Sequence, residues 1–278
     1  MLSTPHPSSG YLAIQPITDE EFESFRELIF EIAGISLCAG KKMMVASRLQ
    51  RRLVHYGLHR FSDYYHLVTD KTHPREMQTL VDLLTTNETY FFREPSHFDF
   101  LRNEILPQHT NNVFRAWSAA CSSGEEVYSL AMVLADTLND RPWEILGSDL
   151  SRRVLKRAQR GHYPMERNEG IDFAFLKKYC LKGVRSQNNT FLIDQKLKTQ
   201  VRFRQINLKE ELPNIGHFDV IFLRNVLIYF NQETKKEIVH RVSDLLKPDG
   251  YLFISHAESL HGIESGLKMI NPSIFRNC

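Results

Sequence analysis

Two adjacent carboxylates, Glu125 and Glu126, stand where the chain could bind the positive end of a small molecule. They follow a loop of small residues, 118–124, that lies between strand-forming residues and an apolar repeat of helical period. A strand that opens onto a helix is a place where α/β sheets bind cofactors. A pyrophosphate favours bare N–H groups there, and the two acids would repel it. The pair suits an ammonium group instead.

Each candidate carboxylate also has a local alternative. Ser123 precedes Glu126 by three residues, the spacing of a capping box in which Glu126 would serve only the helix. Asp149 ends the next predicted strand, where a carboxylate commonly binds ribose hydroxyls. A helix cap is the other reading of Asp149, although Ser151 is better placed for it. If both acids bind a ligand, an ammonium and a ribose together fit S-adenosylmethionine better than NAD or ATP.

The elements that would position these residues alternate between strand and helix from Val113 onward. This alternation predicts a mainly parallel, doubly wound α/β sheet whose ligands bind at the carboxyl ends of the strands. Asn225 follows one such strand, but its type is more common in turns, and Tyr229 is as often a core residue. Strands are predicted at 113–117, 143–149, 201–206, 218–223 and 251–255. Helices are predicted after Glu125, from a cap at Ser151 to Arg160, and at 232–246.

Two stretches of this region interrupt the alternation. Residues 161–199 are irregular, with one helical piece at 172–179 and a possible hairpin near 191–194. Pro248, Asp249 and Gly250 predict a strong turn, and the tail beyond could add a hairpin.

The first 86 residues contain helical patterns and nothing that resembles a strand. Residues 1–17 are predicted to form a loose leader. Thr18 and Glu21 have capping-box spacing, and Gly34 ends the helix that follows. Further helices are predicted at 41–56, at 64–68 with Ser62 as the cap, and at 75–84. A hinge is predicted at 85–95, with its aromatic residues packed onto the second domain and Pro95 stopping a local run.

The helix predicted at 41–56 is basic on one face. Between Gly40 and Arg60 there are six Lys or Arg residues and no Asp or Glu. Such a run is usually a solvated face. The complete absence of acids favours the alternative, a surface that docks an acidic partner.

Composition excludes several classes of function. The chain has 278 residues and a net charge of +2, which gives no global attraction to nucleic acid or membrane. Its four cysteines are far apart and form no C-x-x-C pair, so neither a metal site nor a disulfide framework is expected. No secretory signal and no apolar run of about 20 residues are present. We therefore expect a cytoplasmic protein that is not membrane-inserted.

Five stretches resemble the CheR family of chemotaxis receptor methyltransferases. They are R-L-Q-R-R-L, T-T-N-E-T-Y-F-F-R-E, W-S-A-A-C-S-S-G-E-E-V-Y-S-L-A, F-D-V-I-F-L-R-N-V-L-I-Y-F-N and L-K-P-D-G-Y-L-F, in this order over roughly residues 20 to 260. The resemblance implies a helical receptor-docking domain at 1–88 and a Rossmann-like S-adenosylmethionine-dependent methyltransferase domain at 89–278. It also implies a small β insertion at about 162–199.

The resemblance implies methyl transfer from S-adenosylmethionine to side-chain carboxylates of receptor glutamates, which yields methyl esters and S-adenosylhomocysteine. Arg93 and Tyr229 would be catalytic. The docking residues would be Lys41, Arg48, Arg51 and Arg52, facing the cytoplasmic helices of the receptors. The positions that match cofactor contacts are Asn87, Thr89, Arg93, Glu126, Asp149, Asn207, Leu208, Asn225 and Val226. A glutamate with a pKa near 4.3 is already ionised at neutral pH, so no general base is needed.

Partners and rival functions remain open at this point. In some members the insertion binds a peptide from the receptor C-terminus, but K-G-V-R-S-Q-N-N-T matches the expected glycine-rich loop poorly. We expect a monomer. One alternative is an enzyme that methylates amino groups of DNA, but such an enzyme would be expected to have Asn-Pro-Pro-Tyr where this chain has R-N-V-L-I-Y. A non-catalytic module that senses S-adenosylmethionine is the other alternative.

Overall fold

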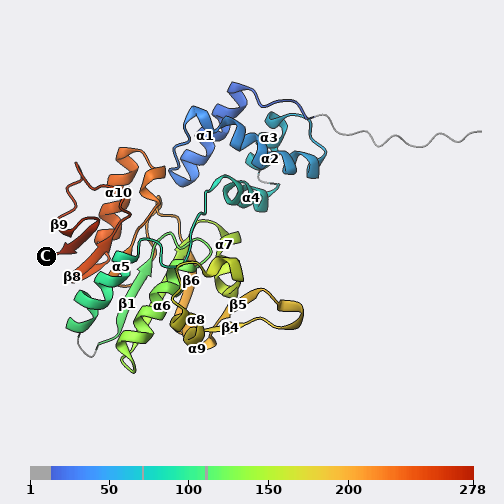
Figure 1. Ribbon diagram of the computed structural model, residues 1–278. Helices are drawn as coiled ribbons and strands as arrows, with labels where there is room; N and C mark the ends of the chain where they lie inside the picture. The colour runs from blue at the N-terminus through green and yellow to red at the C-terminus, as the bar shows by residue number, and fades with distance from the viewer. Residues whose placement is uncertain (1–13, 71, 110–111) are drawn as a thin grey trace, which may run out of the picture. The chain divides into compact units, whose positions relative to one another are not determined.

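The computed structural model describes residues 14–70, 72–109 and 112–278 (Figure 1). Most of the predicted leader, 1–17, therefore lies outside the described residues. The chain divides into two compact units. We call residues 14–32 and 36–84 the helical unit, and residues 33–35 and 85–278 the sheet unit.

The helical unit consists of short helices around one apolar core. The predicted capping box is confirmed, because the Thr18 amide donates to Glu21 Oε2 at 2.9 Å and the Glu21 amide to Thr18 Oγ1 at 3.1 Å. The predicted cap at Ser62 is wrong, since its amide donates to Glu21 Oε1 and the helix begins one residue earlier. The helices are α1 (Asp19–Ala33), η1 (Ala39–Lys41), α2 (Lys42–Tyr56), α3 (Phe61–Thr69) and α4 (Pro74–Leu84).

The sheet unit is built on a seven-stranded sheet of order β6-β2-β1-β7-β8-β10-β9. The first five strands in this order are parallel, as predicted, and a C-terminal hairpin adds the last two antiparallel. The chain runs outward from β1 to β2 and β6, and then returns to the other side of β1 with β7. The switch point is thus between β1 and β7, where such sheets bind ligands. The strands are β1 (Phe114–Ser118), β2 (Trp143–Asp149), β6 (Val201–Gln205), β7 (Phe218–Phe222), β8 (Leu246–Phe253), β9 (Leu267–Asn271) and β10 (Ile274–Asn277).

Helices cover both faces of this sheet through two separate apolar clusters. One cluster joins Phe114 and Phe222 to the helices before and after β1, and the other joins Trp117 and Ile221 to the helix after β7. The helices are α5 (Pro95–Phe100), the turns η2 (Leu101–Ile105) and η3 (Leu106–Gln108), α6 (Glu125–Leu138), α7 (Arg152–Arg160), η6 (Leu227–Tyr229) and α10 (Gln232–Ser243).

One prediction about proline is wrong. Pro95 ends the predicted hinge and also begins α5 as its first residue, because a helix start needs no N–H at that position. Pro248 to Gly250 do not form a turn but lie inside β8, where Asp249 has φ +64° and the register with β7 shifts. That local irregularity, a bulge, accommodates residues that otherwise favour turns.

The insertion after α7 carries a small antiparallel sheet of order β3-β5-β4, which places β4 at an edge. The predicted helix and hairpin are both present (Figure 1). The elements are β3 (His162–Pro164), η4 (Met165–Asn168), α8 (Phe173–Tyr179), β4 (Cys180–Lys182), η5 (Arg185–Gln187), β5 (Thr190–Ile193) and α9 (Gln195–Lys198). Among the described residues, no helix combines the length and the apolar character needed to cross a membrane.

Candidate functional site

The loop between β1 and α6 brings the two predicted carboxylates to the switch point of the sheet. Gly124 caps α6 with φ +96°, and a Cβ there would lie only 2.8 Å from that of Ala158. The capping-box alternative is wrong, because Ser123 Oγ donates to Glu125 Oε2 at 2.7 Å and Glu126 turns elsewhere. Glu126 is therefore available for a role other than capping.

Glu126 is held by the end of its neighbouring strand and by a buried guanidinium. Ser118 Oγ donates to Glu126 Oε1 at 2.6 Å, and Arg224 Nη1 lies 3.2 Å from Glu126 Oε2. Burial raises the pKa of Glu126, although Arg224 acts in the opposite direction. A further positive group beside this carboxylate would thus favour its ionised form.

Glu125 has a different environment although it is the next residue. Its side chain is 1% exposed, and its Oε1 lies 3.2 Å from Arg167 Nη1. The same Arg167 nitrogen donates to the carbonyl oxygen of Thr89 at 3.0 Å. Burial raises the pKa of Glu125 as well. Arg167 thus ties the insertion both to the hinge and to Glu125, whereas Glu126 faces Arg224.

Arg224 is the central residue of the site that sequence reasoning missed. Its side chain is 1% exposed, and its guanidinium joins Glu126, Glu94 at 3.2 Å and the carbonyl oxygen of Arg93. It also lies 5.7 Å from the ring centres of Phe98 and Phe222. Arg224 lies two residues after the mostly apolar strand β7, and this was the signal in the sequence, since a charge there must find buried partners.

Asp149 joins two strand-end loops through backbone bonds. Its Oδ2 accepts from the Ser122 amide at 2.9 Å and its Oδ1 from the Ser151 amide at 2.8 Å. The helix cap itself is Ser151, whose side chain accepts from the Val154 amide. These two bonds hold the carboxylate between the loops that follow β1 and β2. The ribose-binding role of Asp149 remains a prediction.

The predicted hinge packs against this loop. Ser122 Oγ donates to the carbonyl oxygen of Asn87 at 2.9 Å, and Asn87 Nδ2 donates to Thr85 Oγ1. Phe91 is fully buried in the core of the sheet unit. Arg93 lies over the ring of Tyr90 at 5.5 Å. The structure therefore brings the predicted residues of the hinge, Asn87, Thr89 and Arg93, together with the loop that carries Glu126.

The remaining predicted cofactor residues lie at the ends of β6 and β7. Asn207 forms a local turn, with Oδ1 accepting from the Lys209 amide at 3.2 Å, and Leu208 is buried. The Ile206 amide donates to the carbonyl oxygen of Asp149 at 3.2 Å, which links this end to β2. Asn225 has φ +57° and, with Val226, leads into η6. Tyr229 ends η6 and is half-buried.

A second residue that sequence reasoning missed shapes this last loop. The carboxylate of Glu258 accepts hydrogen bonds from four backbone amides. Three of them belong to the segment after Arg224, and the fourth is its own turn at Ser255. The sequence carried no local signal for this, because the partners are about thirty residues apart.

The four predicted docking residues fall into two groups within the helical unit. Arg52 forms two bonds to Glu76 at 2.7 and 2.8 Å, and Arg48 Nη1 donates to the carbonyl oxygens that end α4. Lys41 and Arg51 are exposed. Two of the four positive charges thus have internal partners, and the other two face solvent.

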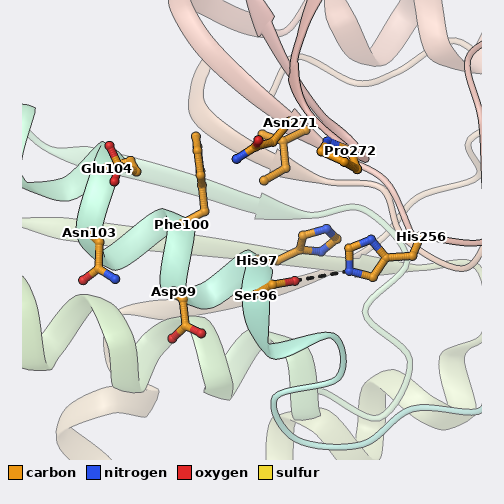
Figure 2. A pocket seen from close by; sticks show the side chains of 10 residues that line it. Ser96, His97, Asp99, Phe100, Asn103, Glu104, His256, Asn271 and Pro272 are labelled. Atoms are coloured by element: carbon orange, nitrogen blue, oxygen red, sulfur yellow. Dashed lines mark hydrogen bonds between the residues drawn. The ribbon is translucent and has the colours of Figure 1, made fainter.

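A pocket of about 460 Å³ lies between α5, η2 and the C-terminal hairpin (Figure 2). Ser96 Oγ and His256 Nε2 are bonded at its edge, 3.2 Å apart. His97, whose pKa is lowered to about 3 by burial and by Arg224, also lines it. None of the nine predicted cofactor residues lines the pocket, so it is distinct from the predicted cofactor site.

Glu94, His97 and His256 present ligand atoms within 4.8 Å of one another, a spacing that could suit a metal ion. Glu94 Oε2, however, lies 3.2 Å from Arg224, and His97 Nε2 lies 2.7 Å from Ser273 Oγ. A guanidinium on the only carboxylate of the group disfavours a second cation there. The cluster is better explained as a hydrogen-bonded support of Arg224.

Comparison with known proteins gives the family. Residues 20–85 match the all-alpha domain of CheR methyltransferases, and residues 87–275 match their SAM-binding domain. The chain is 38% identical over 262 residues to the chemotaxis protein methyltransferase of Escherichia coli K12, covering 93% of this chain and 91% of that protein. It is 40% identical over 278 residues to chemotaxis protein methyltransferase 2 of Pseudomonas aeruginosa, covering 98% of each. It is 36% identical over 272 residues to the chemotaxis protein methyltransferase of Borreliella burgdorferi, covering 94% of this chain and 95% of that one.

The family's domains account for both units, since the matched ranges meet where the helical unit ends and the sheet unit begins. The match to the SAM-binding domain also agrees with the acidic strand ends, which suit the ammonium and ribose of that cofactor. The chain therefore belongs to the CheR family of S-adenosylmethionine-dependent methyltransferases.

Proposed function

We propose that this protein transfers a methyl group from S-adenosylmethionine to glutamate side chains of chemotaxis receptors and so forms methyl esters. The observation that carries the proposal is Glu126, a carboxylate at the switch point that is 14% exposed and that Ser118 and Arg224 hold in place. The names of the relatives support the chemotactic role. The receptor glutamate as acceptor follows from the resemblance to the family.

The chemistry of the strand ends fits the cofactor. Glu126 would bind the methionine ammonium, and Asp149 would bind the ribose hydroxyls. The hinge residues Asn87, Thr89 and Arg93 would close over it, and the β6 and β7 ends would complete the contacts with Asn207, Leu208, Asn225 and Val226. When bound, the cofactor supplies an electrophilic methyl group on a sulfonium.

The protein's own residues need only prepare the acceptor. A receptor glutamate is ionised at neutral pH and attacks without a general base. Arg93 would orient the carboxylate, and its present partner, the carbonyl oxygen of Glu88 at 3.2 Å, is a weak competitor on a half-exposed surface. Tyr229 would offer a hydrogen bond beside the methyl group. Both residues would align one carboxylate oxygen behind the methyl carbon and exclude water.

The exposed surface of η1 and α2 would dock the receptor. Lys41 and Arg51 are free to meet acidic side chains on a receptor helix, which would raise the rate of encounter. Arg48 and Arg52 would contribute through the fold of the helical unit, because their guanidinium groups bond within it.

Transfer of a radiolabelled methyl group to receptor-containing membranes tests the proposal. A glutamyl ester releases its label as methanol in mild base, and this is the expected result. Label that resists base would indicate an N-methyl product and overturn the ester assignment. Binding of S-adenosylmethionine without any transfer would favour a sensing module instead.

The Arg93→Ala and Tyr229→Phe variants test the two catalytic roles. We expect each variant to lower turnover. In Tyr229→Phe, the affinity for S-adenosylhomocysteine should stay within a few fold of the wild-type value. Normal turnover in both variants, with normal cofactor binding, would remove these residues from the mechanism.

A further inference from the structure

Glu258 lies beyond β8, in the loop that leads to the C-terminal hairpin, and its carboxylate is surrounded by backbone N–H groups. Oε2 accepts from the amides of Ser255 at 2.8 Å and Asn225 at 3.0 Å. Oε1 accepts from the amides of Leu227 at 2.7 Å and Ile228 at 3.3 Å. One side chain thus satisfies three donors of the segment 225–228.

This segment carries much of the predicted site. It contains Asn225 and Val226 and ends in η6, which presents Tyr229. Asn225 has φ +57°, in the left-handed region that asparagine adopts more readily than most residues with a Cβ. Glu258 fixes the backbone at this position by accepting from the Asn225 amide.

A carboxylate is the only side chain suited to this position. It offers two oxygens with about four acceptor sites and no donor, which matches four converging N–H groups. Glutamine would direct an NH₂ group at two of those donors and leave them buried without acceptors. Aspartate is one methylene shorter and would not reach both sides of the loop.

We propose that Glu258 is a positioning residue that sets the loop 225–229 for cofactor binding and for methyl transfer. The inference rests on the proposed function, because it takes Asn225, Val226 and Tyr229 as working parts of the site. Glu258 itself touches neither cofactor nor acceptor in this scheme. Its effect passes through the backbone of the loop.

The test compares Glu258→Gln with the wild type and with Glu264→Gln, a control at an exposed glutamate of the same segment. We expect Glu258→Gln to weaken S-adenosylhomocysteine binding, measured by calorimetry without receptor, by about tenfold. Turnover at saturating cofactor should also fall, because Tyr229 moves with the loop. The KM for receptor should not change, because the docking residues belong to the helical unit. Glu264→Gln should match the wild type in all three measurements.

Hydrogen exchange separates a local change in the loop 225–229 from a general loss of stability, and the separate effects on turnover and on the KM for receptor distinguish a positioning role from a merely structural one. The amides of Asn225, Leu227 and Ile228 should exchange faster in Glu258→Gln, while those of the β7 and β8 strands keep their protection. If Glu258→Gln does not fold, Glu258→Asp keeps the charge and is measured in its place, with the same losses expected.

Wild-type cofactor affinity and turnover in the variant would overturn the proposal. A wild type that binds S-adenosylhomocysteine but methylates no receptor would refute the proposed function instead. The binding and exchange measurements would then still decide the role of Glu258.

Discussion

Glu125 and Glu126 are adjacent acids whose charges meet different surroundings. Burial raises the pKa of both, but Glu125 pairs with Arg167 and Glu126 with Arg224 at the switch point. Neighbouring residues on a helix point in different directions, so only one of them can face the cofactor. This makes each acid the natural control for the other.

We predict that Glu126→Gln weakens binding of S-adenosylmethionine by about tenfold or more, because the ammonium loses its charged partner. Glu125→Gln should change this affinity by less than about threefold. Isothermal calorimetry on both variants checks the prediction. Equal losses in the two variants would contradict the assignment of Glu126 as the ammonium ligand.

At the residue scale, the sequence showed which positions could bind but not what holds them. Glu126 and Asp149 were recognisable because strand ends and acidic residues are local features. Arg224 and Glu258 were missed because their partners, Glu126 and the 225–228 amides, lie 98 and about 30 residues away. Bonds from a side chain to distant backbone amides leave no pattern in a single sequence.

The helices and strands were predicted best where an apolar period was long. The parallel strands and α2, α6 and α7 follow from such periods. The helix start at Pro95 was not predicted and the Pro248–Gly250 stretch was misassigned, because proline and glycine also serve at helix starts and bulges. The choice between these uses depends on tertiary packing, which the local sequence does not contain.

Two neighbouring residues of α2 should have different roles, Arg51 in receptor docking and Arg52 in the stability of the helical unit. We predict that Arg51→Glu raises the KM for receptor severalfold with unchanged cofactor affinity and melting temperature, because Arg51 is exposed. Arg52→Glu should instead destabilise the helical unit by about 3 kcal/mol or more, since it places a second acid against the buried Glu76. Receptor kinetics and thermal melts of both variants measure this. A stable Arg52→Glu variant would contradict the structural role.

The same ion pair predicts how the helical unit responds to acid. Burial would raise the pKa of Glu76, but hydrogen bonds from Arg52, Tyr64 and Tyr56 outweigh it, and the pKa is lowered. A carboxyl with a lowered folded-state pKa contributes stability above its unfolded pKa of about 4.3 and loses it as pH falls through the folded value. Chemical denaturation from pH 7 to pH 3 should show this loss. Glu76→Gln should be less stable at pH 7 and should show a weaker pH dependence.

The insertion offers an edge strand for a peptide. In β4, Leu181 is 54% exposed, and Val184 just beyond it is 68% exposed. An extended peptide could pair with such an edge and place an apolar side chain against Leu181.

We predict that a receptor C-terminal peptide binds at the edge of β4 and that Leu181→Asp weakens this binding at least about fivefold. Titration of a fluorescent peptide panel measures this, and Phe173→Asp, an exposed apolar position on α8, is the control. Absence of binding to any receptor C-terminus would exclude tethering through β4.

At the scale of the whole chain, the residues predicted to bind the cofactor and those predicted to dock the receptor belong to different units. Every predicted cofactor and catalytic residue, from Asn87 to Tyr229, belongs to the sheet unit. Every predicted docking residue, from Lys41 to Arg52, belongs to the helical unit. A ligand that binds a native unit stabilises that unit by an amount set by its concentration relative to Kd.

Calorimetry should therefore show which unit binds the cofactor. At 100 times Kd, S-adenosylhomocysteine should stabilise the sheet unit by about 2.7 kcal/mol and raise its unfolding transition by roughly 5–10 °C. Glu126→Gln, which lies in the sheet unit, should roughly halve this stabilisation at the same concentration, because a tenfold weaker Kd leaves about 1.4 kcal/mol. Arg51→Glu, which lies in the helical unit, should retain it in full. A shift confined to the unfolding of the helical unit, identified by its sensitivity to Arg52→Glu, would move the cofactor site out of the sheet unit and contradict the assignment of Glu126.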